Sequence, residues 1–338
     1  WGENYLRVLD EVQAKADGNV ARKSLQTRWA AEVTPDNAHP EYPRPHMVRG
    51  NWVNLNGLWD YAVCSSDRDR MPLAQGQILV PFCIESSLSG VGRRVSPGDA
   101  LWYRRTLEVP SAQNGKVLLH FDAVDNRATV FIDGEPVGSH SGGYTSFSYD
   151  ISRFAGKTVE LSVKVCDPTD DTKACVPHGK QVSNPGGIWY TPVTGIWQTV
   201  WMESVPQSYI KDYNVVTAMD GTVKVDVDVE GDAQQVLVEL LRPQIGYSPE
   251  KPARGLICKA KAKVEPGRTA VLKVRRPKLW TPEQPYLYGL RIKLLKDGKV
   301  IDKVDAYTAI RTVGAKADEN GVRRLTLNDA ILFHFGPL

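Results

Sequence analysis

Three carboxylates lie close together in the sequence, at Asp167, Asp170 and Asp171, with Pro168 among them. Side-chain carboxylates at this density can bind Ca²⁺, or can divide the roles of general acid and general base between them. A solvated acidic turn accounts for the same residues, and we favour that interpretation. This cluster alone therefore does not predict a catalytic site.

Aromatic residues are concentrated in segment 184–201, which holds four of them together with three glycines and two prolines. Its second half, from Gly195 to Trp201, sets large apolar residues beside polar ones, as a strand with one buried face does. Its first half cannot be regular structure, because its prolines lack amide donors and its Gly-Gly pair favours irregular backbone. Trp189 and Tyr190 are thus expected on a loop, where their rings can face a sugar or wedge the edge of a sandwich.

Composition limits the partners that the chain can have. Its 338 residues suffice for two mid-sized domains, and 42 Lys and Arg against 39 Asp and Glu leave a net charge of +3. This balance predicts no nucleic-acid partner, and no apolar run approaches the roughly 20 residues that span a bilayer, so we expect no membrane partner. Because the chain starts at Trp1 without a charged-then-apolar leader, we expect any secretion signal to be removed or never included.

Cysteines and histidines show no metal-binding pattern. No two of the five cysteines form Cys-x-x-Cys; we interpret them as small buried residues of sheets, and a bridge between Cys166 and Cys175 stays open. The six histidines include no pair at ligand spacing. We therefore predict no metal site and no cofactor.

The order of apolar and turn residues predicts strands nearly throughout. Residues 5–16 favour a short helix or a mobile arm, and the proline-rich residues that follow favour an extended strap, which must lie on another surface to be ordered. From Trp52 to Pro206 short apolar runs alternate with turn signals, which is typical of an all-β sandwich. After Pro206, strict alternation at residues 223–229 opens a second series of strands with the size of an immunoglobulin-like sandwich.

Several segments together resemble one known family. They are residues 43–60, which include LNGLWD, and residues 80–90, 101–105, 130–147 and 195–201, the last reading GIWQTVW. In this order they resemble the non-catalytic N-terminal part of the family 2 glycoside hydrolases, the group of β-galactosidases, β-glucuronidases and β-mannosidases. Residues 279–288 look like the signature of the family's second domain, and residues 325–335 look like the strand pair that leads into its barrel.

The resemblance implies an all-β fold with a fixed order of parts. A helix and strap over residues 1–50 precede a jelly-roll, galactose-binding-like sandwich over 51–206. An immunoglobulin-like β-sandwich follows over 207–314, and residues 315–338 are the linker and first strands leading to a (β/α)8 barrel. In the family, two glutamates of that barrel perform retaining hydrolysis. No acidic residue here lies in the family's Asn-Glu motif, so we carry over no catalytic residue and expect the chain to be catalytically inert.

The resemblance also implies which loops approach a substrate. In the family, loops of the first sandwich complete the pocket at the barrel mouth, and the matching loops here precede Gly195 and follow Gly90. Amide and basic groups can bind sugar hydroxyls, and aromatic faces suit a pyranose ring. The candidate substrate-binding residues are Lys180, Gln181, Asn184, Trp189, Tyr190, Arg93 and Arg94. β-Galactosidases place an acidic, cation-binding residue just before the corresponding Trp, whereas residues 186–188 are Gly-Gly-Ile, which puts a sodium site and galactose specificity in doubt.

The other motif residues are expected to be structural. Trp59, Trp102 and Trp197 fall on the inward phase of their strands. Arg104, Arg105 and residues 125–127 are expected to anchor strand edges and loops.

The sequence thus predicts the N-terminal portion of a retaining family 2 exo-glycosidase, which scaffolds the barrel and completes its carbohydrate pocket. The resemblance favours a bacterial periplasmic or secreted protein and leaves homo-oligomerisation open. A free-standing carbohydrate-binding or adhesive β-sandwich protein is the alternative.

Overall fold

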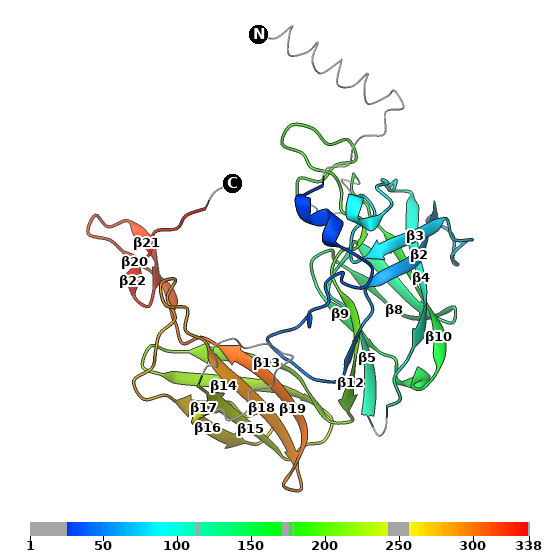
Figure 1. Ribbon diagram of the computed structural model, residues 1–338. Helices are drawn as coiled ribbons and strands as arrows, with labels where there is room; N and C mark the ends of the chain where they lie inside the picture. The colour runs from blue at the N-terminus through cyan, green and yellow to red at the C-terminus, as the bar shows by residue number, and fades with distance from the viewer. Residues whose placement is uncertain (1–25, 113–114, 171–175, 178, 243–256, 337–338) are drawn as a thin grey trace.

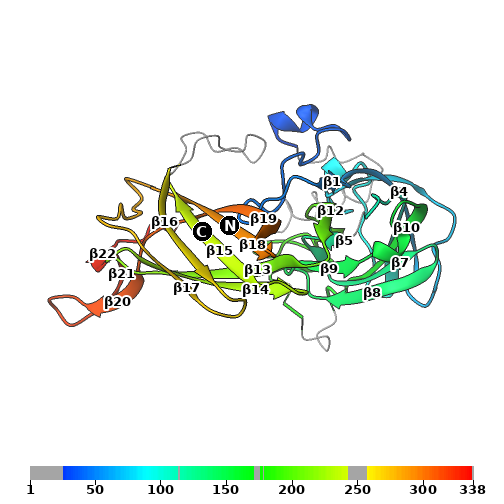
Figure 2. The same cartoon turned by 90° about the horizontal axis from the view of Figure 1, so that it is seen from below.

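Two β-sandwiches and a small third sheet make up the fold. The computed structural model describes residues 26–112, 115–170, 176–177, 179–242 and 257–336, so the helix predicted over residues 5–16 lies outside the described residues. Figures 1 and 2 show the sandwiches side by side, with the third sheet at the end of the second sandwich away from the first. The predicted all-β class, a jelly roll followed by an immunoglobulin-like sandwich, is confirmed.

The first sandwich pairs a six-stranded sheet with a four-stranded one, and all of its strand pairs are antiparallel. The larger sheet has the order β3 (Gly76–Val80), β2 (Gly57–Ser65), β4 (Asp99–Glu108), β10 (Thr158–Cys166), β7 (Arg127–Ile132) and β8 (Glu135–Ser141). The smaller has the order β1 (Trp52–Asn54), β12 (Val200–Pro206), β5 (Gly115–Phe121) and β9 (Phe147–Asp150). A short ladder joins β6 (Val124–Asp125) to β11 (Gly195–Ile196), and 3-10 turns lie at η2 (Ser87–Ser89) and η3 (Ser152–Phe154).

The core of this sandwich shows where strand phase was predictable. Trp59 is buried in the core cluster, as predicted. In β4, however, Leu101 and Tyr103 belong to that cluster, and Trp102 faces the other way. Trp102 is still buried, because its ring stacks on Phe131 at 5.6 Å between centroids. The prediction that Trp102 points into the core is therefore wrong.

The second sandwich has seven strands in two antiparallel sheets. One sheet has the order β13 (Tyr209–Thr217), β14 (Thr222–Glu230) and β17 (Ala270–Lys273), and the other has the order β16 (Cys258–Val264), β15 (Gln235–Leu241), β18 (Tyr288–Lys296) and β19 (Lys299–Thr308). Alternate valines of β14 point into the core, since Val223 and Val225 are fully buried. The turn between β18 and β19 uses Asp297 and Gly298 at φ 50° and 73°, which suits a tight hairpin turn with both central residues at positive φ.

Two further segments frame the sandwiches. The third sheet, which we call the C-terminal sheet, consists of β20 (Val313–Ala317), β21 (Arg323–Leu327) and β22 (Ala330–Ile331). Before β1, the chain forms a 3-10 turn, η1 (Arg28–Glu32), and then irregular backbone. Within the described part of the chain, no helix is long and apolar enough to cross a membrane.

Candidate functional site

Several loops meet at one end of the first sandwich, and we call them the rim: residues 81–95, 123–126, 142–146 and 180–197. Main-chain contacts join the loops, since Ile84 N donates to Thr194 O at 3.3 Å and Gly142 N donates to Asn126 O at 3.1 Å. The β6–β11 ladder joins two more of them. Because these bonds come from backbone groups, the shape of the rim depends little on which side chains face outward.

The two loops predicted to approach a substrate are in contact. The Arg94 guanidinium donates to Ser183 O at 2.7 Å, which ties the loop after Gly90 to the loop before Gly195. Arg93, by contrast, directs its guanidinium to Gln75 Oε1 at 3.1 Å. Both arginines are exposed. The structure thus brings Arg94 to the predicted loop and turns Arg93 toward the chain before β3.

The loop before Gly195 presents aromatic rings on a hydrogen-bonded support. Tyr190 N donates to Lys180 O at 2.8 Å, and Gln181 Oε1 accepts from Val193 N at 2.6 Å. Gln181 therefore supports the loop. Trp189 and Tyr190 remain exposed by 48% and 62%, and the side chains of Lys180 and Asn184 are exposed as well. Large aromatic surfaces left in water on a supported loop can receive the apolar face of a ligand ring.

Trp197 belongs to the rim. Its indole Nε1 donates to Gly143 O at 2.7 Å, and its ring meets Tyr144 edge to face at 6.2 Å. The side chain is only half-buried, whereas Trp201 is 1% exposed. The predicted inward phase of Trp197 is therefore wrong in degree, because the indole covers loop 142–146 beside the main core.

Three carboxyl groups lie behind the rim, and only one of them was singled out from the sequence as part of an acidic cluster. Asp167 is 8% exposed, and its Oδ2 accepts from Thr169 Oγ1 at 2.7 Å and from Thr194 Oγ1 at 2.8 Å. The interpretation of this residue as part of a solvated turn is wrong, whereas Asp170 is exposed and Asp171 lies outside the described residues. Glu85 Oε2 accepts from Thr194 N at 2.9 Å.

The third carboxyl group, Asp125, was interpreted from sequence as a loop anchor, and it is 4% exposed. Burial raises the pKa of Asp125 to about 7, and the charges of Asp167 and Glu85 add to the rise. Burial also raises the pKa of Glu85. Asn126, which is 1% exposed, has neither side-chain polar atom in a hydrogen bond. The signal that could have found this group is the Val-Asp-Asn sequence directly after a buried strand.

The carboxyl groups do not form a metal centre. Among the residues that the structure describes, no group of three or more His, Cys, Asp or Glu side chains is placed to hold a metal ion. A partly protonated Asp125 can instead donate or accept a hydrogen bond within the rim near neutral pH. Gly143 lies directly against it, since a Cβ there would be 2.6 Å from Asp125 Cγ.

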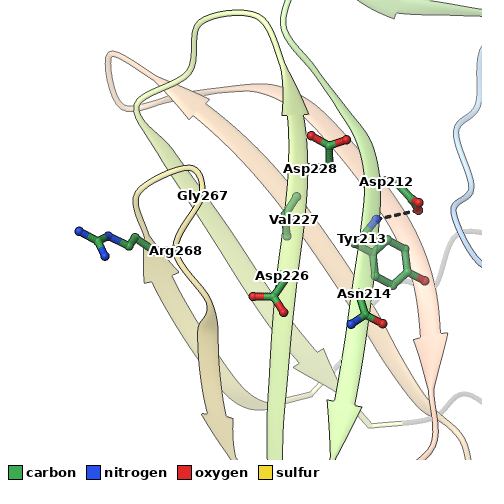
Figure 3. A pocket seen from close by; sticks show the side chains of 8 residues that line it. All are labelled: Asp212, Tyr213, Asn214, Asp226, Val227, Asp228, Gly267 and Arg268. Carbon is green, nitrogen blue, oxygen red and sulfur yellow. Dashed lines mark hydrogen bonds between the residues drawn. The ribbon is translucent and has the colours of Figure 1, made fainter.

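A separate acidic hollow of about 320 Å³ lies on the outer face of β13 and β14. Figure 3 shows Asp212, Asn214, Asp226 and Asp228 along these two strands, with Arg268 directed away from them. Asp212 and Asp228 are directly opposite each other in the ladder. The hollow is on the second sandwich and shares no residue with the rim.

Comparison with known proteins identifies the family. Residues 93–206 match the description "Glycosyl hydrolases family 2, sugar binding domain", and residues 208–311 match "Glycosyl hydrolases family 2". Together the two matches cover more than half of the chain. The chain belongs to glycoside hydrolase family 2.

Relatives in family 2 are longer than this chain. A β-galactosidase from Thermoanaerobacter pseudethanolicus is 28% identical over 230 residues, which are 64% of this chain and 29% of the relative. β-Galactosidase BoGH2A from Bacteroides ovatus is 26% identical over 269 residues, 73% of this chain and 29% of the relative. Among solved structures, a Ruminococcus gnavus β-glucuronidase aligns with a TM-score of 0.67 at 22% identity, covering 86% of this chain and 49% of that one. The chain thus spans between about a quarter and a half of the family 2 proteins that it matches.

Proposed function

We propose that this chain is the non-catalytic N-terminal portion of a retaining family 2 exo-glycosidase. In this function the two sandwiches scaffold a catalytic barrel, and the rim completes the pocket for the terminal sugar. The whole protein would hydrolyse O-glycosidic bonds in two displacements, with both reactive carboxyl groups supplied by the barrel. The chain alone would have no glycosidase activity.

The rim is the observation that carries this proposal. It presents Trp189 and Tyr190 on a loop whose backbone is tied at Lys180 and Gln181, beside the exposed Arg94. Flat apolar faces with nearby hydrogen-bonding groups are the usual components of a sugar-binding surface. The rim is an open surface, which is the shape expected for one wall of a pocket.

The C-terminal sheet supports the scaffolding role. Large apolar side chains are exposed on β20–β22 and on the residues after them: Val313 by 77%, Leu325 by 57%, Phe333 by 77% and Phe335 by 90%. Contiguous apolar surface of this kind marks an interaction site in a soluble protein. In the proposed function, the catalytic barrel covers this surface.

The test uses a panel of nitrophenyl β-glycosides, including galactosides, glucuronides and mannosides, with the purified 338-residue chain. The proposal expects no turnover of any of them. Measurable hydrolysis that is lost on substitution of Glu85, Asp125 or Asp167 would show that the chain carries its own catalytic carboxyl groups and would refute the proposal. The matched control is the exposed Asp170→Asn variant.

A free-standing carbohydrate-binding module is the second candidate, and the exposure of Trp189 and Tyr190 is the observation that favours it. The two functions differ in affinity, since one wall of a pocket binds a monosaccharide weakly. Calorimetric titration with simple sugars should therefore give no measurable binding. Micromolar affinity that disappears in Trp189→Ala would favour the binding module instead.

A further inference from the structure

The segment of residues 42–49, which we call the strap, lies between the two sandwiches (Figure 1). On one side, Val48 pairs with Asp305 of β19 through Val48 N to Asp305 O at 2.8 Å and Asp305 N to Val48 O at 3.1 Å. On the other side, the Tyr42 ring meets the rings of Trp52 and Trp201 at 5.2 and 5.6 Å. The strap thus contacts both sandwiches.

Arg49 connects the sandwiches through its charge. Its side chain is 5% exposed, and its Nη1 lies 3.3 Å from Glu203 Oε2 on β12 of the first sandwich. Its Nη2 lies 2.8 Å from Asp302 Oδ2 on β19 of the second sandwich and donates to Ile210 O at 2.6 Å. Both carboxylates are buried, at 1% and 7% exposure. One guanidinium therefore neutralises a buried carboxylate from each sandwich.

Glu203 is held by further partners of the first sandwich. Arg44 Nη2 lies 2.8 Å from Glu203 Oε1, and His120 Nε2 lies 3.2 Å from the same atom. The His120 ring in turn stacks on Trp201 with 4.0 Å between centroids. These contacts fix the carboxylate in one orientation, so that its other oxygen faces Arg49.

The space around this network is otherwise open. A hollow of about 860 Å³ lies between the sandwiches beside the strap, with Lys116 and Glu230 on opposite walls. These two residues form a partly exposed ion pair at 3.6 Å, and exposed pairs of this kind restrain little. Rotation of one sandwich against the other would separate Arg49 from one of its carboxylates and leave buried charges unpaired. The network therefore permits one relative orientation.

We propose that Arg49, Glu203 and Asp302 are positioning residues that hold the two sandwiches at one angle. Because the rim belongs to the first sandwich and the C-terminal sheet follows the second, this angle sets the distance between the two. The inference rests on the proposed function, in which the C-terminal sheet holds the catalytic barrel and the rim completes its pocket. The three residues would then act on catalysis without touching substrate.

The angle can be measured on the 338-residue chain by small-angle X-ray scattering. The test variant is R49M/E203Q/D302N, which removes all three charges together, because replacing a whole buried network is far better tolerated than removing one partner. We expect a larger radius of gyration and a longer maximum dimension than in wild type. The matched control is D220N/K273M, which removes an exposed ion pair on one sheet and should leave the scattering curve unchanged.

A second variant covers the case in which the triple variant does not fold. R49K keeps the charge but lacks the planar fork that reaches Glu203, Asp302 and Ile210 O together, so its scattering should shift in the same direction by less. Scattering curves of both variants that superimpose on that of wild type would overturn the inference. This outcome is independent of glycosidase activity, so it leaves the proposed function standing.

Kinetics separate a positioning role from a purely structural one. In a protein that carries this chain together with a catalytic module, R49K should lower kcat by about tenfold to a hundredfold with a smaller change in KM, because misplaced reacting groups cost rate. Unchanged kcat alongside altered scattering would show that the angle does not position the pocket. Absence of activity in the wild-type protein would instead count against the proposed function.

Discussion

Replacing Asp125 by asparagine is expected to stabilise the chain at neutral and alkaline pH. The folded protein holds the pKa of this carboxyl group near 7, against an ordinary value of 3.8. Below pH 3.8 both the folded and the unfolded chain keep the proton, so the residue then causes no loss of stability. As the pH rises to about 7, the unfolded chain gives up the proton first and becomes favoured. An asparagine side chain at this position has no such proton to lose and would escape this penalty.

The size of the effect follows from the two pKa values. The gap between 3.8 and about 7 corresponds to about 4 kcal/mol at 1.36 kcal/mol for each pKa unit. Solvent near the rim screens part of this, so we expect about 2 kcal/mol at pH 8. At pH 4 the two proteins should be nearly equal in the free energy of unfolding.

Urea denaturation of both proteins at pH 4, 6 and 8 measures this difference. Its pH dependence should shrink in an Asp167→Asn background, because the Asp167 charge contributes to the raised pKa of Asp125. A difference that does not change with pH would refute the reasoning. So would an Asp125→Asn variant that is less stable than wild type at pH 8.

Three further changes test other parts of the fold. Gly138→Ala should cost about 1–3 kcal/mol in urea denaturation, because a Cβ there would lie 2.1 Å from Tyr149 Cε1; Gly98→Ala, where nothing lies within 4 Å, is the neutral control. Asp212→Asn should raise the free energy of unfolding by about 0.5 kcal/mol at low salt, because Asp228 lies directly opposite (Figure 3), and a lowered urea midpoint would contradict this. Glu203→Gln should abolish the stability that wild type loses between pH 4.5 and about 2, the range across which Arg44, Arg49 and His120 hold down the Glu203 pKa; this amounts to about 3 kcal/mol, and an equally steep acid transition in the variant would exclude it.

Much of the fold was predictable because it is recorded locally. The alternation at residues 223–229 and the turn at Asp297-Gly298 need only their neighbours in sequence, and both appear where the patterns place them. The face of Trp102 was not predictable, because four successive residues of β4, 100–103, are buried. A strand covered on both faces has no alternation of period two, so its phase cannot be read.

The buried polar groups were unpredictable for a different reason. Asp167 follows a strand and stands beside further acids, as in many solvated turns, and its burial depends on Thr194, which lies 27 positions away. Arg49 pairs with residues 154 and 253 positions away. Single-sequence patterns report periodicity and local turn chemistry, so they carry no information on such partners. Of the rim, sequence reasoning reached the exposed side chains and missed the carboxyl groups behind them.

The construction of the rim bears on how a pocket wall can change its ligand without losing its shape. Its loops are tied largely through backbone groups, such as Lys180 O, Ser183 O and Gly143 O. The side chains that face outward from the same loop, including Trp189 and Tyr190, take little part in this support. Substitutions at those positions would therefore alter recognition at small cost in stability, since exposed residues away from such ties usually change the free energy of unfolding by less than about 0.5 kcal/mol. In the proposed function, a rim of this kind lets family 2 proteins share one scaffold while differing in the sugar that they accept.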